Sequence, residues 1–221
     1  MYSLDEAYNQ KFFAKRKSLE WRVPIMCEAV TDAYPDTKSL IDFGCGNADL
    51  VRGFLSRGIQ AYGIEGTRNC TPYIQLPYID DEKEHLSVFN RVMIHDLRTP
   101  IHEYFDGKYY PHPTINIKTD LAICLEVAEH LEEEYANELI LNIINVSDNV
   151  IFTAASPSQL GHYHVNLRPL RWWIEYFESY NYEFDYMSYH IMRHKLEQSG
   201  KSHIKGIKAW YTNLMCFKKK E

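Results

Sequence analysis

Residues 39–66 read SLIDFGCGNADLVRGFLSRGIQAYGIEG, and the fold prediction starts from this stretch. Ser39–Phe43 is a short apolar segment with the length and composition of a buried strand. The loop Asp42–Asn47 follows it, and glycines in that loop allow a tight turn and a close approach of the backbone to a ligand. Ala48–Arg57 is expected to form a helix, and Ile59–Ile64 the next strand. The stretch therefore predicts the strand–turn–helix–strand unit of a parallel sheet.

An acidic residue, Glu65, follows the second of these strands, 19 positions after Gly46. A carboxylate at this place can accept hydrogen bonds from both ribose hydroxyls of an adenosine. The amides at the start of the intervening helix can receive a carboxylate of the ligand. The sequence has no third glycine after Gly46 at the dinucleotide-binding spacing, and it has no GxxxxGK[ST] phosphate loop. The expected ligand therefore contains an adenosine and lacks a pyrophosphate.

Strand-like and helix-like segments alternate along the rest of the chain, which favours an α/β fold. We expect one doubly wound, Rossmann-like domain over residues 1–221, with a mainly parallel seven-stranded sheet and helices on both faces. Residues 1–35 are expected to be helical, and residues 67–90 and 106–118 are predicted to be insertions near the substrate side. The other expected elements are helices at Ser3–Arg22, Pro24–Ala33, Glu132–Asn145 and Pro169–Tyr180, and strands at Val92–His95, Leu121–Leu125, Val150–Ala154, about 183–189 and about 209–217.

The composition argues against several classes of protein. The chain has 221 residues, a net charge of −6 and a pI near 5.9, whereas nucleic-acid binding relies on a basic surface. No apolar run approaches the roughly 20 residues that span a bilayer, so no membrane segment is expected. Residues 1–17 are polar and do not resemble a secretory signal. The five cysteines are scattered without a CxxC pair, which is typical of a reducing, cytoplasmic location rather than of a disulfide framework or a zinc site.

In two blocks the sequence resembles the class I S-adenosylmethionine-dependent methyltransferases. The blocks are Ser39–Gly66 and Asp120–Leu131 (DLAICLEVAEHL), and the resemblance extends over about Ser39–Phe217. In that superfamily the glycine loop holds the methionine end of S-adenosyl-L-methionine and the acid after the second strand holds the ribose. Residues after the third strand read the adenine edge, and residues after the fourth flank the sulfonium. The cofactor-binding residues that the resemblance implies are Asp42, Gly44, Cys45, Gly46, Asn47, Glu65, Gly66, Asp96, Leu97, Leu125 and Glu126.

A narrower resemblance concerns the last third of the chain. Val150–Pro157 (VIFTAASP), Gly161–Asn166 (GHYHVN) and Pro169–Trp173 are similar to an uncharacterised bacterial and phage branch, which carries a Gly-His-Val-Asn loop before a Pro-x-x-Tyr/Trp-Trp helix. The ending Ala209–Leu214 also suits that branch. Its members are associated with modified glycans or small metabolites. The resemblance therefore implies a small-molecule or glycan substrate.

Four polar residues are the predicted catalytic set. Methyl transfer from a sulfonium is an in-line displacement that needs alignment, and a hydroxyl acceptor also benefits from a general base such as histidine. His130 follows the fourth strand, and the other three candidates, His162, His164 and Asn166, follow the fifth on the same rim. We expect His164 or His130 to be the base and Asn166 to position the acceptor. A structural cap at His130 and solvated loop histidines at positions 162 and 164 are the alternatives.

Two other functions stay open beside O-methylation of a small molecule or sugar. Glu126, Glu129 and His130, with the later His-x-His, could bind a divalent metal. This set resembles that of the small-RNA 3′-end 2′-O-methyltransferases, in which a metal would activate a 2′-hydroxyl. The same Glu-x-x-Glu-His pattern is widespread in class I methyltransferases without a metal, so our assignment includes no metal. The second alternative is a protein that binds S-adenosylmethionine without transferring methyl groups.

Overall fold

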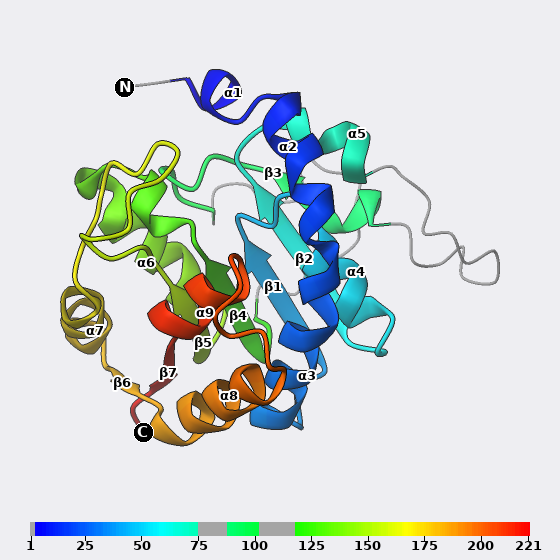
Figure 1. The fold of residues 1–221 in the computed structure, drawn as a ribbon. Coiled ribbons are helices and arrows are strands. Elements are labelled where there is room, and N and C mark those ends of the chain that lie inside the picture. Colours follow the sequence, from blue (N-terminus) through cyan, green and yellow to red (C-terminus); the bar gives the residue numbers. More distant parts are fainter. Residues whose placement is uncertain (1–2, 75–87, 102–117) are drawn as a thin grey trace.

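The computed structural model describes residues 3–74, 88–101 and 118–221, and this part of the chain is built on a seven-stranded sheet. The strands are β1 (Ser39–Phe43), β2 (Gln60–Glu65), β3 (Val92–Ile94), β4 (Leu121–Leu125), β5 (Asn149–Thr153), β6 (Tyr182–Phe184) and β7 (Met215–Lys219). Their order across the sheet is β3-β2-β1-β4-β5-β7-β6, and β7 runs antiparallel to both of its neighbours (Figure 1). The predicted mainly parallel, doubly wound sheet is confirmed.

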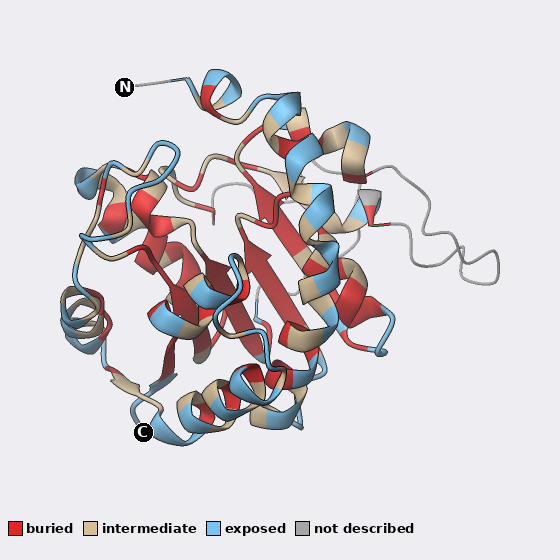
Figure 2. Cartoon of the chain, in the orientation of Figure 1, coloured by how far each residue is buried: buried red, intermediate tan, exposed pale blue. Residues whose placement is uncertain are grey.

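Helices cover both faces of the sheet. They include α3 (Val23–Ala33), α4 (Asp49–Leu55), α6 (Ala136–Ile144), α7 (Leu170–Ser179) and α8 (Tyr186–Gln198). Successive strand residues point to opposite faces, so Leu40 of β1 packs in one apolar core with α3, α4 and α8, and the next residue, Ile41, packs in another with α6 and α7. The strands between these layers are buried and the outer faces of the helices are exposed (Figure 2).

The carboxyl ends of β1, β2 and β4 lie side by side. Phe43 pairs with Ile64 of β2 and with Cys124 of β4, so the chain leaves all three strands at the same edge of the sheet. A doubly wound sheet binds its ligand outside this edge. The loops that carry the predicted site residues therefore start from neighbouring points.

The N-terminal segment is not the single helix predicted over Ser3–Arg22. It consists of α1 (Leu4–Ala7), α2 (Gln10–Arg16) and a 3-10 helix, η1 (Lys17–Arg22). Asn9 separates the first two, because its side-chain oxygen accepts hydrogen bonds from the amides of Lys11 and Phe12. An asparagine in this position caps a new helix rather than continuing the previous one. Helices α1 and α2 lie beyond the carboxyl ends of β1 and β2 (Figure 1).

The strand predicted at about 183–189 is wrong beyond β6, because α8 begins two residues after that strand ends. Aromatic residues favour a strand in this region, but the Asp185 carboxylate accepts a hydrogen bond from the amide of Ser188 and so caps a helix. The strand predicted at about 209–217 is also partly wrong, since the helix α9 (Ile207–Asn213) precedes β7.

Most of the two predicted insertions, 67–90 and 106–118, lies outside the described residues. The remaining short helices of the described part are η2 (Arg68–Cys70), α5 (Thr71–Ile74), η4 (Phe89–Arg91), η6 (Ala128–His130) and η7 (Glu133–Tyr135). Three of them, η2, α5 and η4, belong to the two described ends of the first insertion. No helix in the described part of the chain is long and apolar enough to cross a membrane.

Candidate functional site

The glycine loop after β1 folds back onto the end of β2. The amides of Gly44 and Cys45 donate hydrogen bonds to the carbonyl oxygen of Ile64, at 2.8 and 2.9 Å. Gly44 has φ +72°, and a Cβ atom there would lie 2.4 Å from Cγ2 of Val127. The backbone conformation and the close approach of Val127 both require glycine at this position.

The carboxylate of Glu65 lies against this loop. It is 9% exposed, and its two oxygens accept hydrogen bonds from the amides of Gly46 and Gly66, each at 2.9 Å. Burial raises the pKa of Glu65, while these amides and the Arg16 guanidinium act in the opposite direction. Each oxygen keeps a second lone pair, so the group can accept two further hydrogen bonds from a diol.

Two cavities adjoin the glycine loop, and Arg16, Gly44 and Glu126 line both of them. The first lies between the loop and α1 and α2. The second lies between the loop, η1 and α9. All eleven predicted cofactor-binding residues line one or both: Gly44, Gly46, Glu65, Gly66, Asp96, Leu97 and Glu126 the first, and Asp42, Gly44, Cys45, Asn47, Leu125 and Glu126 the second.

Two acceptor groups are buried beside the second cavity. Burial raises the pKa of Asp42 to about 8, and the guanidinium of Arg16 opposes this shift. Asn47 donates from Nδ2 to the carbonyl oxygen of Phe13 at 3.1 Å, but its buried Oδ1 has no hydrogen-bond partner among the described residues. A carboxyl group and an unpaired acceptor in one cavity match a cationic N–H donor such as an ammonium group.

Asp96 lines the first cavity after β3, where the resemblance places the adenine edge. Its carboxylate is held by Arg98, whose Nη2 lies 2.6 Å from Oδ2 and whose Nε donates to both oxygens at 3.0 Å. Leu97, which is buried, forms an apolar wall next to it. Asp96 thus supplies a polar group, and Leu97 an apolar contact, at this end of the first cavity.

His130 lies in η6, after β4, and lines the first cavity. Its Nδ1 is 3.2 Å from the carbonyl oxygen of Tyr163. Because a carbonyl only accepts, the neutral ring carries its proton on Nδ1, and Nε2 is the atom that can accept one. Burial, and then the charge of His164, lower the pKa of His130 to about 4. The imidazole is therefore neutral at neutral pH.

The other two histidines do not reach either cavity. His164 lies beside His130, with ring centroids 4.9 Å apart, and its Nδ1 is 2.7 Å from the carbonyl oxygen of Gln159. His162 points toward the N-terminal segment, where its Nε2 is 2.7 Å from the carbonyl oxygen of Ala7. Both rings are thus oriented by backbone carbonyl oxygens. His164 lies beside the first cavity, and His162 contacts helix α1, which lies over that cavity.

Asn166 is buried behind the same loop and lines neither cavity. Its side-chain Oδ1 accepts a hydrogen bond from Nε of Arg168 at 3.1 Å, and its backbone N–H donates to the carbonyl oxygen of Glu129 at 3.0 Å. Of the four predicted catalytic residues, the structure brings His130 to a cavity and places Asn166 where it holds the loop.

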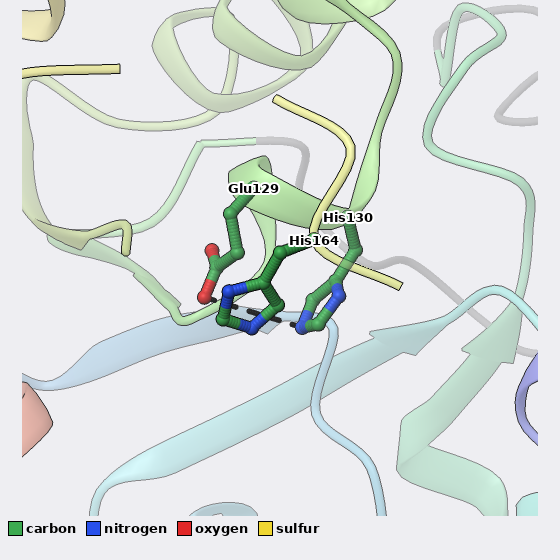
Figure 3. A group of neighbouring side chains, drawn as sticks. All are labelled: Glu129, His130 and His164. Carbon is green, nitrogen blue, oxygen red and sulfur yellow. Dashed lines mark ion pairs between the residues drawn. The ribbon is translucent and has the colours of Figure 1, made fainter. Parts of the chain in front are cut away.

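A compact cluster forms where the candidate metal ligands were predicted. One ligand atom from each of Glu129, His130 and His164 lies within 4.8 Å of the others (Figure 3). Glu129 is 0% exposed, and neither of its carboxylate oxygens has a hydrogen-bond partner in the described part of the chain. Burial and the charge of Glu126 raise its pKa well above the usual range. Glu126 itself is not in the cluster, and it accepts a hydrogen bond from Nδ2 of Asn213 at 3.1 Å.

Several residues that line the cavities were not among the predicted site residues. The N-terminal segment contributes Leu4, Tyr8, Phe12, Phe13 and Arg16, and the second cavity adds Leu19, Arg22, Val23, Asp49, Leu50, Lys205, Gly206, Ala209 and Trp210. The four-residue spacing of Tyr8 and Phe12 is a sequence signal for one shared face. No comparable signal connects Lys205 or Trp210 to the glycine loop.

Comparison with protein-family models finds no match for this chain, and comparison with curated proteins finds none. Solved structures do resemble it. The plantazolicin methyltransferase BamL has a TM-score of 0.55 at 12% identity, over 93% of this chain and 86% of that one. The magnesium protoporphyrin IX methyltransferase ChlM from Synechocystis PCC 6803, with bound SAH, has a TM-score of 0.52 at 18% identity, over 77% and 76%. The [4+2]-cyclase SpnF has a TM-score of 0.53 at 13% identity, over 90% and 80%.

At these identities the similarity shows the fold. The chain has the Rossmann-like fold of the class I S-adenosylmethionine-dependent methyltransferases. One of the three structures is a cyclase, so the fold by itself does not specify methyl transfer. The function has to be argued from the site.

Proposed function

We propose that this chain is an S-adenosylmethionine-dependent methyltransferase. The proposal rests on the position of Glu65. Its buried carboxylate lies at the end of β2, accepts a hydrogen bond from the amide of Gly46 in the glycine loop, and lines the first cavity. This is the arrangement that binds the ribose hydroxyls of an adenosine.

The residues around Glu65 fit the rest of that cofactor. Asp96 and Leu97 would hold the adenine, and the acceptors of Asp42 and Asn47 would face the ammonium group of the methionine end. Glu126 lines both cavities and would lie near the sulfonium. When bound, S-adenosylmethionine supplies an electrophilic methyl group, and the protein's task is to align an acceptor with it.

The acceptor we propose is a hydroxyl group of a small molecule or glycan. The name of the magnesium protoporphyrin IX methyltransferase, which shares the fold, describes a small-molecule acceptor. His130 is the proposed base because it lines the cavity and its Nδ1 faces the carbonyl of Tyr163, so that Nε2, which lies 4.0 Å from Oε1 of Glu129, is the ring nitrogen that can take the hydroxyl proton. In this assignment His164 positions the ring of His130. His162 holds helix α1 over the first cavity, and Asn166 holds the loop after β5 against Glu129.

Calorimetry with S-adenosylhomocysteine tests the cofactor assignment. We expect binding to wild-type protein, and loss of binding in Glu65→Ala and in Glu65→Ala combined with Gly44→Val. Valine at position 44 would clash with Val127 and adopt an unfavourable φ, so Glu65→Ala alone, with its folding checked by circular dichroism, is the cleaner variant. Glu175→Ala on the exposed face of α7 is the matched control. Unchanged affinity in folded Glu65→Ala protein would falsify the assignment.

A metal-assisted RNA or nucleotide 2′-O-methyltransferase is the second candidate function, and the cluster of Glu129, His130 and His164 favours it. Both rings direct Nδ1 at a backbone carbonyl, as metal-binding imidazoles commonly do. The net charge of −6 argues against RNA. Calorimetric titration with Mn²⁺ tests the idea. Binding that disappears in Glu129→Gln would support it, and no binding to wild-type protein would remove it.

A protein that binds the cofactor without transferring methyl groups is the third candidate. Transfer of labelled methyl groups from S-adenosylmethionine to any acceptor in a panel of alcohols, phenols and sugars would exclude it. We further propose that residues 1–221 form a single domain and that the protein is cytoplasmic, as the composition predicts. Sedimentation analysis would give the oligomeric state.

A further inference from the structure

Two arginines of the N-terminal segment, Arg16 and Arg22, line the second cavity. Neither guanidinium forms a hydrogen bond or an ion pair with any residue in the ranges 3–74, 88–101 and 118–221. Each instead stacks on an aromatic ring: Arg16 on Phe12 with Cζ 5.3 Å from the ring centre, and Arg22 on Trp210 at 4.2 Å.

Arg16 lies directly over the glycine loop. A Cβ atom on Gly46 would be 3.3 Å from its Nε, and Arg16 is one of the residues shared by both cavities. A ligand that runs from Glu65 in the first cavity to Asp42 in the second must therefore pass this guanidinium. Arg16 is placed to contact the part of the ligand that reaches beyond the glycine loop.

Arg22 is in an unfavourable electrostatic position. Burial, and then repulsion from Arg16, lower its pKa to about 10. The acidic groups of Asp49, Glu126 and Asp42 act in the opposite direction but do not cancel this shift, so an anion placed between the two guanidinium groups would offset the remaining cost. The recess thus has the electrostatic character of an anion-binding site.

Carboxyl groups line the same cavity at other positions. Asp42 and Glu126 line it, and neither is within 4.0 Å of either guanidinium in the described structure. Asp49 lines it too, but is paired with Arg52 at 3.1 Å. Carboxyl and guanidinium groups that line one cavity at separate positions are complementary to a zwitterion, in which an ammonium and a carboxylate are carried by one carbon.

We propose that Arg16 and Arg22 bind the α-carboxylate of the cofactor's amino-acid end, while Asp42 and Asn47 face its ammonium group. This inference rests on the proposed function and deepens it. It makes the two arginines the residues that select an intact α-amino-acid end over a decarboxylated one.

Paired ligands test this assignment by calorimetry. The probes are S-adenosylhomocysteine and its decarboxylated analogue, which differs by the α-carboxylate alone, and 5′-methylthioadenosine, which lacks the whole amino-acid end. We expect wild-type protein to bind S-adenosylhomocysteine at least about tenfold more tightly than the decarboxylated analogue, because charge-assisted hydrogen bonds are lost with the carboxylate. In Arg16→Gln and Arg22→Gln that ratio should fall toward one, with little change in affinity for the decarboxylated analogue.

The controls keep the outcomes distinct. Arg22→Lys keeps the charge and should retain part of the ratio, and Arg171→Gln, at an exposed position on α7, should retain all of it. An unchanged ratio in both glutamine variants, or an equal loss of affinity for both ligands, overturns the inference and leaves the cofactor assignment intact. Wild-type protein that binds neither S-adenosylhomocysteine nor 5′-methylthioadenosine overturns the proposed function and the inference together.

Discussion

The Nε2 atom of His162 lies 2.7 Å from the carbonyl oxygen of Ala7, so the loop after β5 is fastened to the N-terminal helix α1. The other side of α1 is fastened to the segment after β2: the Asp5 carboxylate accepts a hydrogen bond from the Thr67 hydroxyl, and Asn69 donates from Nδ2 to the Asp5 carbonyl at 3.0 Å. Residues 4–16, which we call the strap, therefore cover the first cavity and are tied on two sides.

Replacing His162 by Phe should loosen the strap. Phenylalanine keeps the stacking contact with Phe12, whose ring centroid is 5.6 Å away, but removes the hydrogen bond to Ala7. A bond worth about 1 kcal/mol corresponds to roughly fivefold faster release of S-adenosylhomocysteine, measured by stopped-flow fluorescence. The matched control is His190→Phe on the exposed side of α8. Equal release rates for His162→Phe and wild type would show that the strap does not limit release.

Cofactor binding should release a proton from Asp42 near neutral pH. Its pKa of about 8 in the folded chain, raised by burial, stands well above the value of 3.8 for an accessible aspartate. Arg16 and Arg22 lower this pKa, whereas Glu65 and Asp49 raise it further. An ammonium group placed beside Asp42 favours the ionised form, so affinity should increase as pH rises toward about 8.

Calorimetry of S-adenosylhomocysteine binding at pH 6.5, in two buffers with different ionisation enthalpies, measures that proton. The Asp42→Asn variant should abolish the difference between buffers, and 5′-methylthioadenosine, which has no ammonium group, should not show it. The same shift has a consequence for stability: between about pH 4 and 8 the folded state binds a proton that the unfolded state lacks, so this group's contribution to stability falls as pH rises. Identical binding enthalpies in both buffers would contradict the ionisation of Asp42.

The sequence predicted those parts of the site whose residues are close together along the chain or follow neighbouring parallel strands. The strand, glycine loop, helix and acidic residue of 39–66 are contiguous, and parallel strands then bring the predicted cofactor residues to one edge of the sheet. Arg22 and Trp210 could not be found in this way, because their contact joins the two ends of the chain. The direction of His162 was equally inaccessible, since the carbonyl that captures it belongs to Ala7.

Removing the cap of α8 should destabilise the fold. In Asp185→Ala the amide of Ser188 loses its acceptor, which lies 3.2 Å away. Losing an N-cap costs about 1 kcal/mol, which corresponds to a decrease in Tm of roughly 2–4 °C for a chain of this length. Thermal unfolding followed by circular dichroism measures it, and Asp185→Asn, which keeps an acceptor oxygen, should unfold within about a degree of wild type. If the alanine and asparagine variants unfold at the same temperature, the capping bond is not what stabilises α8.

Replacing His130 by Gln should separate methyl transfer from cofactor binding. The ring lines the first cavity, and its Nδ1 is oriented by the carbonyl of Tyr163. The variant loses Nε2, the atom proposed to accept the hydroxyl proton. The residues around Glu65 that are proposed to bind the cofactor are unchanged. We expect the rate of labelled methyl transfer to fall by about 10²–10⁴, with the Kd for S-adenosylhomocysteine unchanged within about twofold. His164→Gln, which changes a neighbour of the base, should lower the rate by less than about tenfold and leave transfer insensitive to EDTA. Equal losses in both variants, together with inhibition by EDTA, would contradict the general-base role and support a metal held by Glu129, His130 and His164.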